Sequence, residues 1–520
     1  MTESTLTRRS LLGRAAAGAL AAASAASASA AEAPCAAPSS PAAWDETFDV
    51  VVVGSGFAGL CAAYAAAKKG ASVVVLEKMP TFGGNSIIDG GELSVTGAPQ
   101  QKALGIEDSK ELWMKDTLSA GANMNYPDKV RALADAMLPN YLWLRDEIGV
   151  EFSETALTQD GGHSVARSVI TKNGSGSGYI NPLLAKCREL GVKCLTRQKA
   201  LHVLRSPATG RVEGVEIRAG YRFPKEASGK VRTIRARRAV VLCHGGFAAD
   251  VKYRMTLDPK LTERFEITNQ PGATGELWRE ASRIGCSVIQ ASWIQVVPWC
   301  SPYEKGMGTL WTFSHGSAAV YGIWVDSKTG RRFVNELANR KVRSDAVIPL
   351  LNAGSKCLAI TDVRGAEHLE KNRPGAIGPM LECRGLVKFD SLDALADAYA
   401  IPKEALREEV EGYNKAVREK VRVDRWGRPM REDATEMRNG PWYAAELAPK
   451  IHHCMGGIAT DARGQALDVS TDAPIPGLFA AGEACGGVHG AVRLGCNAIL
   501  DCTVNGRLAG DSAADEAPWC

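Results

Sequence analysis

Three glycines near the start of the chain have the spacing of a turn that binds a dinucleotide. Gly54, Gly56 and Gly59 lie in the segment GSGFAG, and the acidic residue Glu77 follows a later apolar run. Such glycines allow a tight turn, close approach of the backbone to a pyrophosphate, and close packing of a helix on a strand. Glu77 would accept hydrogen bonds from the adenosine ribose. The pattern predicts a dinucleotide cofactor.

The elements around this turn must present it at the end of a parallel sheet. The apolar run 48–53 predicts a strand, 60–69 a helix, and 72–76 a second strand that ends at Glu77. A strand, a glycine turn, a helix, a strand and an acidic residue in this order form a complete nucleotide-binding unit. The bare glycine pattern leaves open a glycine-rich turn in some other α/β protein.

A second glycine-rich stretch distinguishes a flavin from a nicotinamide cofactor. The segment TFGGNS at 81–86 follows Glu77 closely, and Gly90 and Gly91 come next. An NAD-binding chain would continue with further alternating strands and helices, whereas glycine pairs here let the backbone lie along a pyrophosphate and a flavin. This arrangement favours FAD.

Four later motifs carry a family resemblance. They are NQPGATG at 269–275, RFVNE at 332–336, HHCMGG at 452–457 and AGEACGGVHGAVRLGCNAI at 481–499. In this order they resemble the flavoprotein part of the fumarate reductase flavocytochrome family, from about Asp45 to Ala514. The related reductases of urocanate, methacrylate and arylacrylate share them, so the family is better identified than the substrate.

The resemblance implies an α/β fold with a discontinuous, Rossmann-like FAD-binding domain and an inserted α+β clamp domain that closes over the flavin. Tryptophan and basic residues are frequent over 291–451, and glycine-rich sequence returns at His452. The predicted domains are 45–290 and 452–520 for FAD binding and 291–451 for the clamp. FAD is expected to be noncovalent, because the long His-containing attachment segments of succinate-oxidising relatives are absent.

The residues predicted to bind FAD come from the glycine-rich turns, from the turn HGGF at 244–247 and from positions that contact the flavin in the family. They are Gly54, Gly56, Ala58, Gly59, Glu77, Lys78, Gly84, Asn85, Ser86, Gly90, Gly91, Gly246, Gly275, His453, Glu483, Asn497, Ala498 and Ile499.

The resemblance also places His452, Arg493 and Arg340 at the substrate. Reduction of an enoate adds hydride to the β-carbon, so negative charge moves onto the carboxylate, and fixed donors there stabilise the transition state. The guanidinium of Arg493 matches a carboxylate and stays charged. In the family an arginine protonates the α-carbon, and Arg340 occupies its position. Arginine is a weak acid, but an enolate-like carbon is a strong base.

The sequence departs from the family where the second carboxylate of fumarate would bind. Val297 replaces a histidine before proline, Ser314 and His315 replace a Thr-Glu pair, and Ala318 replaces an arginine of the proton relay. A buried carboxylate without partners is costly. The expected substrate is therefore a monocarboxylate of the cinnamate, methacrylate or urocanate type, not fumarate. His315 is predicted to take the place of the missing glutamate in the relay to Arg340.

Apolar and aromatic side chains around Val297 are interpreted as a site for a hydrocarbon or aryl group, with the core of the clamp as the alternative. They are Val296, Val297, Trp299, Tyr303, Trp311 and Phe313. The predicted substrate-binding residues are Val297, Trp299, Trp311, Ser314, His315, His452, Arg493 and Cys496, and the predicted catalytic residues are Arg340, His452, Arg493 and His315. Cys496 replaces the usual glycine of the family and is expected to narrow the pocket or to fill space.

An export signal precedes the folded part. The segment TRRSLL at 7–12 comes before an Ala-rich stretch at 15–28, which is typical of twin-arginine export. The predicted signal peptide is 1–30 and the linker 31–44, which implies a periplasmic or extracytoplasmic protein. An uncleaved membrane anchor is the alternative, but the run is short and weakly hydrophobic. No later run predicts an integral membrane segment.

Composition limits the partners. Lys plus Arg number 62 against 58 Asp plus Glu, so nothing favours nucleic acid. The chain has 14 cysteines but no CxxCH haem motif. No metal site is predicted, and an iron-sulfur cluster on Cys454, Cys485 and Cys496 is a weak alternative because their spacing fits no cluster motif. A separate exported multihaem cytochrome c is therefore the expected electron donor in anaerobic respiration.

Two other functions stay open. One is reduction of a neutral conjugated enone or lactone, such as a steroid ring, with Arg493 and His452 polarising an uncharged oxygen. The other is an electron-transfer flavoprotein without an organic substrate, against which the pair Arg340 and Arg493 speaks. A pocket large enough for fused rings would favour the first.

Overall fold

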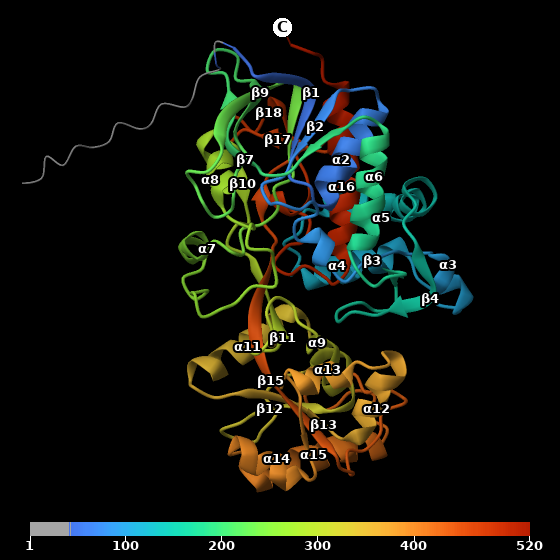
Figure 1. Ribbon diagram of the computed structural model, residues 1–520. Helices are drawn as coiled ribbons and strands as arrows, with labels where there is room; N and C mark the ends of the chain where they lie inside the picture. Colours follow the sequence, from blue (N-terminus) through green and yellow to red (C-terminus); the bar gives the residue numbers. More distant parts are fainter. Residues whose placement is uncertain (1–40, 42, 520) are drawn as a thin grey trace, which may run out of the picture. The chain divides into compact units, whose positions relative to one another are not determined.

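The computed structural model describes residues 41 and 43–519, so the predicted signal peptide and most of the predicted linker lie outside the described residues. An eight-stranded sheet forms the first lobe (Figure 1), with the order β17-β18-β9-β1-β2-β6 and the pair β7-β8 joined to β9. Its strands are β1 (Glu46–Val53), β2 (Val73–Leu76), β6 (Lys193–Leu195), β7 (Gln198–Arg205), β8 (Val212–Ala219), β9 (Lys230–Leu242), β17 (Gln465–Leu467) and β18 (Pro474–Ala480).

The central strands are parallel and buried on both faces. β1 pairs with β2 from Val50↔Val73 and with β9 from Val50↔Ala239 onward. Because side chains alternate along a strand, Val50 and Val52 join the core under one set of helices. Val51 and Val53 face the opposite core, with β7 and β8. The run of valines thus forms the strand predicted at 48–53, with a core on each of its faces.

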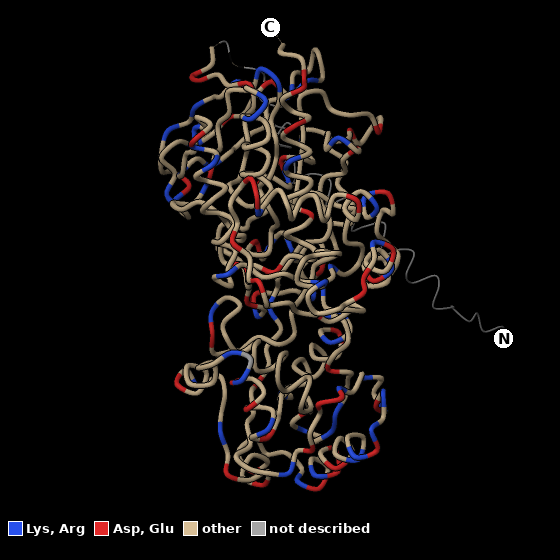
Figure 2. Tube along the Cα trace, turned by 90° about the vertical axis from the view of Figure 1, so that its right-hand side faces the viewer, with Lys and Arg blue, Asp and Glu red and all other residues tan. Residues whose placement is uncertain are grey.

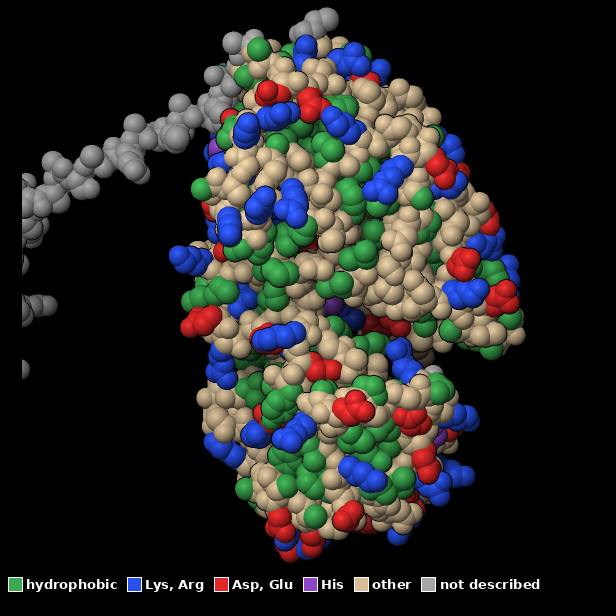
Figure 3. Space-filling model, in the orientation of Figure 1, with side chains coloured by type: hydrophobic (Ala, Val, Ile, Leu, Met, Phe, Trp, Pro, Cys, Tyr) green, Lys and Arg blue, Asp and Glu red, His purple; other side chains and the backbone are tan. Residues whose placement is uncertain are grey.

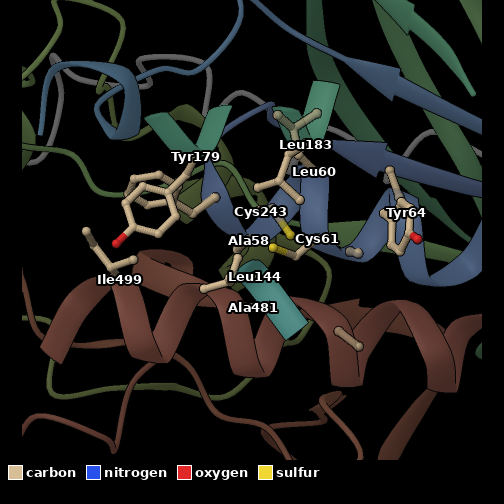
Figure 4. Close-up of a cluster of buried hydrophobic side chains, with 14 of the residues drawn as sticks. Ala58, Leu60, Cys61, Tyr64, Leu144, Tyr179, Leu183, Cys243, Ala481 and Ile499 are labelled. Carbon is tan, nitrogen blue, oxygen red and sulfur yellow. The ribbon is translucent and has the colours of Figure 1, made fainter. Parts of the chain in front are cut away.

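Helices α2 (Phe57–Lys68), α6 (Ser177–Glu189) and α16 (Asn497–Asp515) cover one face. Figure 4 shows Leu60 and Cys61 of α2 between Leu183 of α6 and the helix α16. A Cβ at Gly506 would lie 2.5 Å from the carbonyl oxygen of Ala58, so α16 can approach α2 only because this residue is glycine. The contact fixes the start of α16, which carries Asn497, Ala498 and Ile499.

The remaining elements of the first lobe lie around these layers. A three-stranded sheet β3 (Glu92–Ser94), β5 (Ser168–Thr171) and β4 (Phe152–Thr158) ends at a loop that contains Asp160. The helices are α3 (Pro99–Ala103), α4 (Lys110–Ala120), α5 (Pro127–Trp143), α7 (Val251–Leu257) and α8 (Glu276–Arg283); short pieces are η1 (Ser86–Ile88), η2 (Leu144–Ile148), η4 (Gly482–Ala484), β10 (Val288–Ile289) and β16 (Gly457–Ile458).

A five-stranded sheet forms the second lobe, with the order β11-β15-β13-β12 and β14 on β15. The strands are β11 (Ile294–Cys300), β12 (Ile323–Asp326), β13 (Cys357–Thr361), β14 (Val387–Phe389) and β15 (Trp442–Cys454). The helices are α9 (Trp311–Phe313), α10 (Ala319–Tyr321), α11 (Arg340–Asn352), α12 (Val363–Asn372), α13 (Ile377–Glu382), α14 (Leu392–Tyr399) and α15 (Lys403–Arg418). A π-helical turn, η3 (Ser314–Ala318), joins α9 to α10.

Strands β11 and β15 lead into and out of the second lobe (Figure 1). They pair as Gln295↔His453 and Val296↔Ile451, so His452 is the extra residue of a β-bulge. Bulges redirect side chains and are frequent near active sites. The predicted domain boundary between 451 and 452 falls inside β15, which is one continuous strand. The domain limits themselves stay a prediction.

The start of one predicted helix differs from the structure. α2 begins at Phe57, three residues before the predicted helix, because Gly56 is its N-cap and the amide of Leu60 already bonds to the carbonyl of Gly56. The glycine-rich segment 174–178 contains the start of a helix, because α6 begins at Ser177 after the turn formed by Ser175 and Gly176.

Three further features of the described residues are the distribution of charge, the hydropathy of the helices and the state of the cysteines. Basic and acidic residues are interspersed around the trace (Figure 2). Among the described residues, no helix is long and apolar enough to cross a membrane. The described cysteines are free thiols, most of them buried.

Candidate active site

A cavity with about 980 Å³ of empty space, part of it open to solvent, lies at the carboxyl ends of β1, β2, β9 and β18. Gly54 follows β1, Glu77 follows β2, His244 follows β9, and Ala481 follows β18; all four line the cavity. Ligands of open parallel sheets bind outside the carboxyl ends of the strands. The cavity is thus in the position expected for a dinucleotide.

The glycine turn fits a pyrophosphate. A Cβ at Gly54 would lie 2.3 Å from the carbonyl oxygen of Cys243, and the backbone has a left-handed φ of 104°. A Cβ at Gly59 would lie 2.0 Å from the carbonyl oxygen of Gly54, so α2 packs tightly against the turn. The first turn of α2 has no acidic residue, so its partial positive charge is available to an anion. This cradle accommodates the phosphates of FAD.

Hydrogen bonds from Ser55 of the glycine turn and from Met79 hold the Glu77 carboxylate in place. One carboxylate oxygen accepts hydrogen bonds from Ser55 Oγ at 2.5 Å and from Ser55 N at 3.2 Å, and the other from Met79 N at 2.7 Å. The side chain lines the cavity and is buried. A fixed carboxylate at this strand end suits the ribose hydroxyls of FAD.

The predicted FAD-binding residues fall into two groups. Those that line the cavity are Gly54, Gly56, Ala58, Glu77, Lys78, Gly84, Asn85, Ser86 and Glu483. Those outside its lining are Gly59, Gly90, Gly91, Gly246, Gly275, His453, Asn497, Ala498 and Ile499. Gly246 contributes to the cavity indirectly, because it leaves room for the side chain of Glu483: a Cβ at Gly246 would lie 2.4 Å from Glu483 Oε1. Gly275 instead meets the ring of Tyr253.

A polar cluster in the cavity joins the predicted residue Lys78 to three residues that were not predicted. Lys78 Nζ donates to Thr274 Oγ1 at 2.6 Å and lies 3.6 Å from Glu276, and Lys199 lies 3.2 Å from Glu276. Burial would raise the pKa of Glu276, but the charge of Lys78, a hydrogen bond from Thr274 and the charge of Lys199 lower it to about 2. The motif at 269–275 marked the position of Thr274, but nothing in the sequence indicated Glu276.

Three predicted substrate residues meet in the buried part of the site. Arg493 Nη2 lies 2.9 Å from His452 Nε2, and His452 Nδ1 lies 2.8 Å from Thr268 Oγ1. Because arginine only donates, Nε2 accepts, and the ring proton is on Nδ1. Burial, with the charges of Arg493 and Arg340, holds the pKa of His452 well below its usual value. His452 is therefore a neutral side chain beside a guanidinium.

Arg493 and Arg340 are held near each other by Gln295. Gln295 Nε2 donates to the carbonyl oxygen of Arg493 at 2.8 Å, and its Oε1 accepts from Arg340 Nη1 at 3.1 Å. Burial and the charge of Arg340 lower the pKa of Arg493 to about 10, so it remains charged near neutral pH. Gln295 was not predicted, because no motif surrounds it in the sequence. The two cations together prepare the site for an anion.

Asp160 is the carboxylate of this group. Its Oδ2 accepts from Arg340 Nη2 at 2.8 Å, and its Oδ1 lies 3.3 Å from His315 Nε2. Burial would raise its pKa, but Arg340 and His315 hold it well below the usual value. Asp160, which was not predicted, therefore links the predicted residues His315 and Arg340. Figure 3 shows the hollow between the lobes, where histidine, basic and acidic side chains gather.

His315 lies on the π-helical turn and is enclosed by two residues. Its ring stacks on Trp299 with centroids 4.6 Å apart, and its Nδ1 lies 3.0 Å from Arg343 Nη1. Arg343 is fully buried, and its guanidinium lies 4.2 Å from the centroid of the Trp299 ring. Burial and the charge of Arg340 lower the pKa of Arg343 to about 9, although Asp160 opposes this shift. Arg343 also escaped prediction from the sequence.

The residues predicted to form the apolar substrate pocket differ in burial. Val297, Trp299 and Phe313 are buried together in the core of the second lobe, with Trp311 packed against them. Tyr303 is 58% exposed, and its hydroxyl lies 3.1 Å from Glu446. Of the group, Trp299 contacts the charged site most directly, through His315 and Arg343. The apolar substrate pocket stays a prediction.

The other predicted residues are engaged in local contacts. Ser314 Oγ donates to the carbonyl oxygen of Trp299 at 2.7 Å. Cys496 has a left-handed φ of 63°, and its Sγ lies 3.6 Å from Glu92 Oε2. Burial and the charge of Asp160 raise the pKa of Glu92 to about 7. His489, in the motif at 481–499, bonds to Asp501 at 3.0 Å.

Comparison with known proteins adds to this geometry. Residues 49–499 match the FAD binding domain family. The chain is 39% identical to the acrylate reductase flavoprotein subunit of Shewanella woodyi, over 90% of this chain and 91% of that protein.

Two solved structures are similar along most of the chain. An open conformation of a flavocytochrome c3 fumarate reductase has a TM-score of 0.72 and 29% identity, covering 99% of this chain and 83% of that chain. The 3-ketosteroid-Δ4-(5α)-dehydrogenase of Rhodococcus jostii RHA1, in complex with 4-androstene-3,17-dione, has a TM-score of 0.72 and 25% identity, covering 92% and 100%.

Proposed function

Since the chain belongs to the FAD binding domain family and is an FAD-dependent reductase of carbon–carbon double bonds in unsaturated carboxylates, we propose that its substrate is a monocarboxylate rather than fumarate. The observation that carries this proposal is the arrangement of Arg493, His452 and Arg340 in one cluster, with Arg493 buried. It offers the guanidinium groups of Arg493 and Arg340 to a single carboxylate, with His452 Nε2 accepting from Arg493 and so orienting it. The acids in view are acrylate, methacrylate, cinnamate and urocanate types.

The residues at the second carboxylate position support this choice. Val297 is fully buried among apolar side chains, and the hydroxyl of Ser314 already donates to Trp299 O and Leu310 O. His315 is engaged by Asp160 and Arg343. A second carboxylate would therefore lose its hydration without gaining a free donor from these three residues. The relative named acrylate reductase is consistent with a one-carboxylate substrate.

The chain's own residues perform three tasks in this reaction. Reduced FAD, when bound, supplies hydride to the β-carbon of the substrate. Arg493, with His452 beside it, holds the carboxylate and stabilises the charge that develops on it. Arg340 then gives a proton from its guanidinium to the α-carbon, which completes the saturated acid. Gln295 and Asp160 keep Arg340 in position during this step.

The cellular setting is part of the proposal. We propose that FAD is noncovalent, that the chain is exported by the twin-arginine pathway, and that a separate multihaem cytochrome c supplies electrons in anaerobic respiration. The arginine pair Arg8-Arg9 and the lack of a CxxCH motif support export and a separate haem donor. Cell fractionation with an Arg8→Lys, Arg9→Lys variant tests the export, since loss of the arginine pair should leave the protein in the cytoplasm.

Reduction of a neutral enone is the second candidate, favoured by the similarity to a steroid dehydrogenase. Arg493 is 6% exposed, and its guanidinium bonds to neutral groups, the carbonyl oxygen of Leu494 and His452 Nε2, so its buried positive N–H groups are costly unless an anion binds beside them. A ketone offers no charge to offset them. The carboxylate substrate is therefore the better match to this site.

Anaerobic oxidation of reduced methyl viologen tests the proposal. The FAD-loaded protein is supplied with acrylate, methacrylate, crotonate, cinnamate, p-coumarate, urocanate, fumarate and 4-androstene-3,17-dione. Turnover of one or more monocarboxylates, abolished in Arg340→Ala and kept in the exposed control Arg364→Ala, is the expected result. Turnover of fumarate at a comparable rate would overturn the monocarboxylate assignment, and turnover of the steroid alone would support the enone reading.

A further inference from the structure

Asp160 lies between the proposed proton donor and the histidine on the π-helical turn. Arg340 Nη2 is 2.8 Å from Oδ2, and His315 Nε2 is 3.3 Å from Oδ1. Gly161 N donates to Oδ1 at 2.8 Å and fixes the carboxylate in the loop. One carboxylate thus joins two nitrogen bases from different elements of the second lobe.

The hydrogen bonds define the proton positions in this chain of groups. Arg343 Nη1 faces His315 Nδ1 at 3.0 Å, and arginine can only donate. Nδ1 is therefore an acceptor, and the neutral ring of His315 has its proton on Nε2, toward Asp160. Burial, with the charges of Arg343 and Arg340, lowers the pKa of His315, although the hydrogen bond to Asp160 opposes this. Protonated His315 is therefore a stronger acid than an ordinary histidine and transfers its proton readily to Asp160.

The proposed reaction leaves Arg340 in need of a proton. After it protonates the α-carbon it is a neutral guanidine, which is a far stronger base than a carboxylate. Resting on the proposed function, we propose that Asp160 returns a proton to Arg340 after each turnover and takes that proton from His315. Asp160 acts through Arg340 and does not touch the substrate.

The step balances without any change of oxidation state. A proton from water adds to Nδ1 of His315, which gives up its hydrogen bond from Arg343, and the Nε2–H bond then breaks as an O–H bond forms on Asp160. After the carboxyl group rotates about its Cβ–Cγ bond, the O–H bond breaks and an N–H bond forms on Arg340 Nη2. Asp160 ends as it began, and His315 returns to its starting tautomer when Nδ1 gives a proton to water and Nε2 takes one up, so the net change is one proton moved from water to Arg340. Water can reach the ring, because the side chain of His315 is 16% exposed.

The charges around Asp160 suit a carboxylate that is protonated only transiently. The titratable and charged side chains around it are Glu92, His163, His315, Arg340, Arg343, His452, Arg493 and Cys496. The arginines among them favour the ionised form of Asp160, so a proton that reaches it moves on to the neutral guanidine.

Comparison of a first turnover with steady-state turnover tests the proposal in Asp160→Asn. In the reduced FAD-loaded variant Arg340 begins protonated, so oxidation of the bound flavin by a turned-over monocarboxylate should proceed within about threefold of the wild-type rate. Steady-state kcat should fall about 100-fold or more, the size expected for loss of a proton-transfer group. His315→Gln should show the same separation and serves if Asp160→Asn does not fold.

The matched control is Asp424→Asn. Asp424 is a buried carboxylate of the second lobe, bound to Arg332 at 2.8 Å, and it is not part of this site. Both rates should stay near wild type in this variant. Equal loss of the first turnover and of kcat in Asp160→Asn would show that Asp160 only holds Arg340, and an unchanged kcat would exclude any role. Failure of the wild type on every acid, or activity in Arg340→Ala, would instead contradict the proposed function.

Discussion

The carboxylate of Asp160 lies directly against the backbone of Gly495. A Cβ at Gly495 would be 1.5 Å from Asp160 Oδ2, the oxygen that bonds to Arg340. His163 Nε2, from the same loop as Asp160, lies 2.9 Å from the carbonyl oxygen of Gly495. The loop after β4 and the segment before α16 are therefore fitted to each other at the site.

Gly495→Ala should push Asp160 away from Arg340. We expect kcat to fall at least about tenfold, because the methyl group and the carboxylate oxygen cannot share this space. FAD content, measured by absorbance after gel filtration, should be unchanged. The control is Gly412→Ala on α15, where a Cβ has nothing within 4 Å and alanine favours the helix. Full activity in Gly495→Ala would show that Asp160 can relax without consequence.

Arg493→Lys should weaken both binding and reduction of the substrate. A lysine keeps the charge but cannot face a carboxylate with two parallel donors and bond to His452 as well. A fall in kcat/KM of about 100-fold is expected, measured with reduced methyl viologen. The exposed Arg364→Ala supplies the baseline. A wild-type kcat/KM would mean that point charge alone is enough.

Glu77→Gln should lower the affinity for FAD. The amide nitrogen of glutamine would face a group of donors, because Ser55 and Met79 all donate to the present carboxylate. The expected Kd for FAD, from equilibrium dialysis of the apoprotein, is at least about tenfold higher. Glu46→Gln at the start of the neighbouring strand β1 is the control, since Glu46 makes only peripheral ion pairs, with Lys193 and Arg232. Equal Kd values would assign the ribose to other residues.

Glu92 should make stability depend on pH in the weakly acidic range. Its pKa is raised to about 7 in the folded chain, so the folded state binds this proton more tightly than the unfolded state. Stability from this group is present below the unfolded pKa of 4.5 and is lost as pH rises to about 7. The loss amounts to roughly 3 kcal/mol at most.

Urea unfolding of Glu92→Gln and wild type at several pH values measures this contribution. The stability advantage of the variant should grow between about pH 4.5 and pH 7 and then level off. A constant difference across that range would show that Glu92 titrates normally. The control is Glu404→Gln, at an exposed residue of α15.

Cys496→Gly should stabilise the fold. The left-handed φ of 63° costs a residue with a Cβ about 1 kcal/mol, which glycine avoids. Thermal unfolding should therefore shift upward, unless the contact of Sγ with Glu92 outweighs the strain. Ala400→Gly, at an exposed residue with φ 54°, is the matched control and should gain stability without any change in activity. A lower unfolding temperature for Cys496→Gly alone would reveal the value of the thiol contact.

The nucleotide-binding unit was predictable because its parts are adjacent in sequence. The glycine turn, the valine strand and Glu77 lie within one short segment, and each is defined by local geometry. Arg493, His452 and His315 could be named only through the motifs that surround them or the family positions they match. The structure brings Arg493 and His452 into contact and brings His315 to Asp160.

The rest of the site depends on contacts between distant segments. Asp160 and Arg340 are 180 residues apart, and Gln295 and Arg493 are 198 apart, so no local pattern could pair them. Val297 and Phe313 illustrate a second limit, because an apolar residue that packs in a core and one that lines a pocket have the same sequence signature. Only the packing shows which is which.

The bulge in β15 has a consequence for how this chain can vary. If residue 452 were deleted, Ile451 and His453 would follow each other in a regular ladder with Val296 and Gln295. The sheet itself therefore does not require His452, whereas Arg493 and Thr268 both bond to it. A shorter strand could still fold into the same lobe and yet have no histidine beside the guanidinium. The number of residues in β15, and not only their types, therefore decides whether a histidine lies beside Arg493.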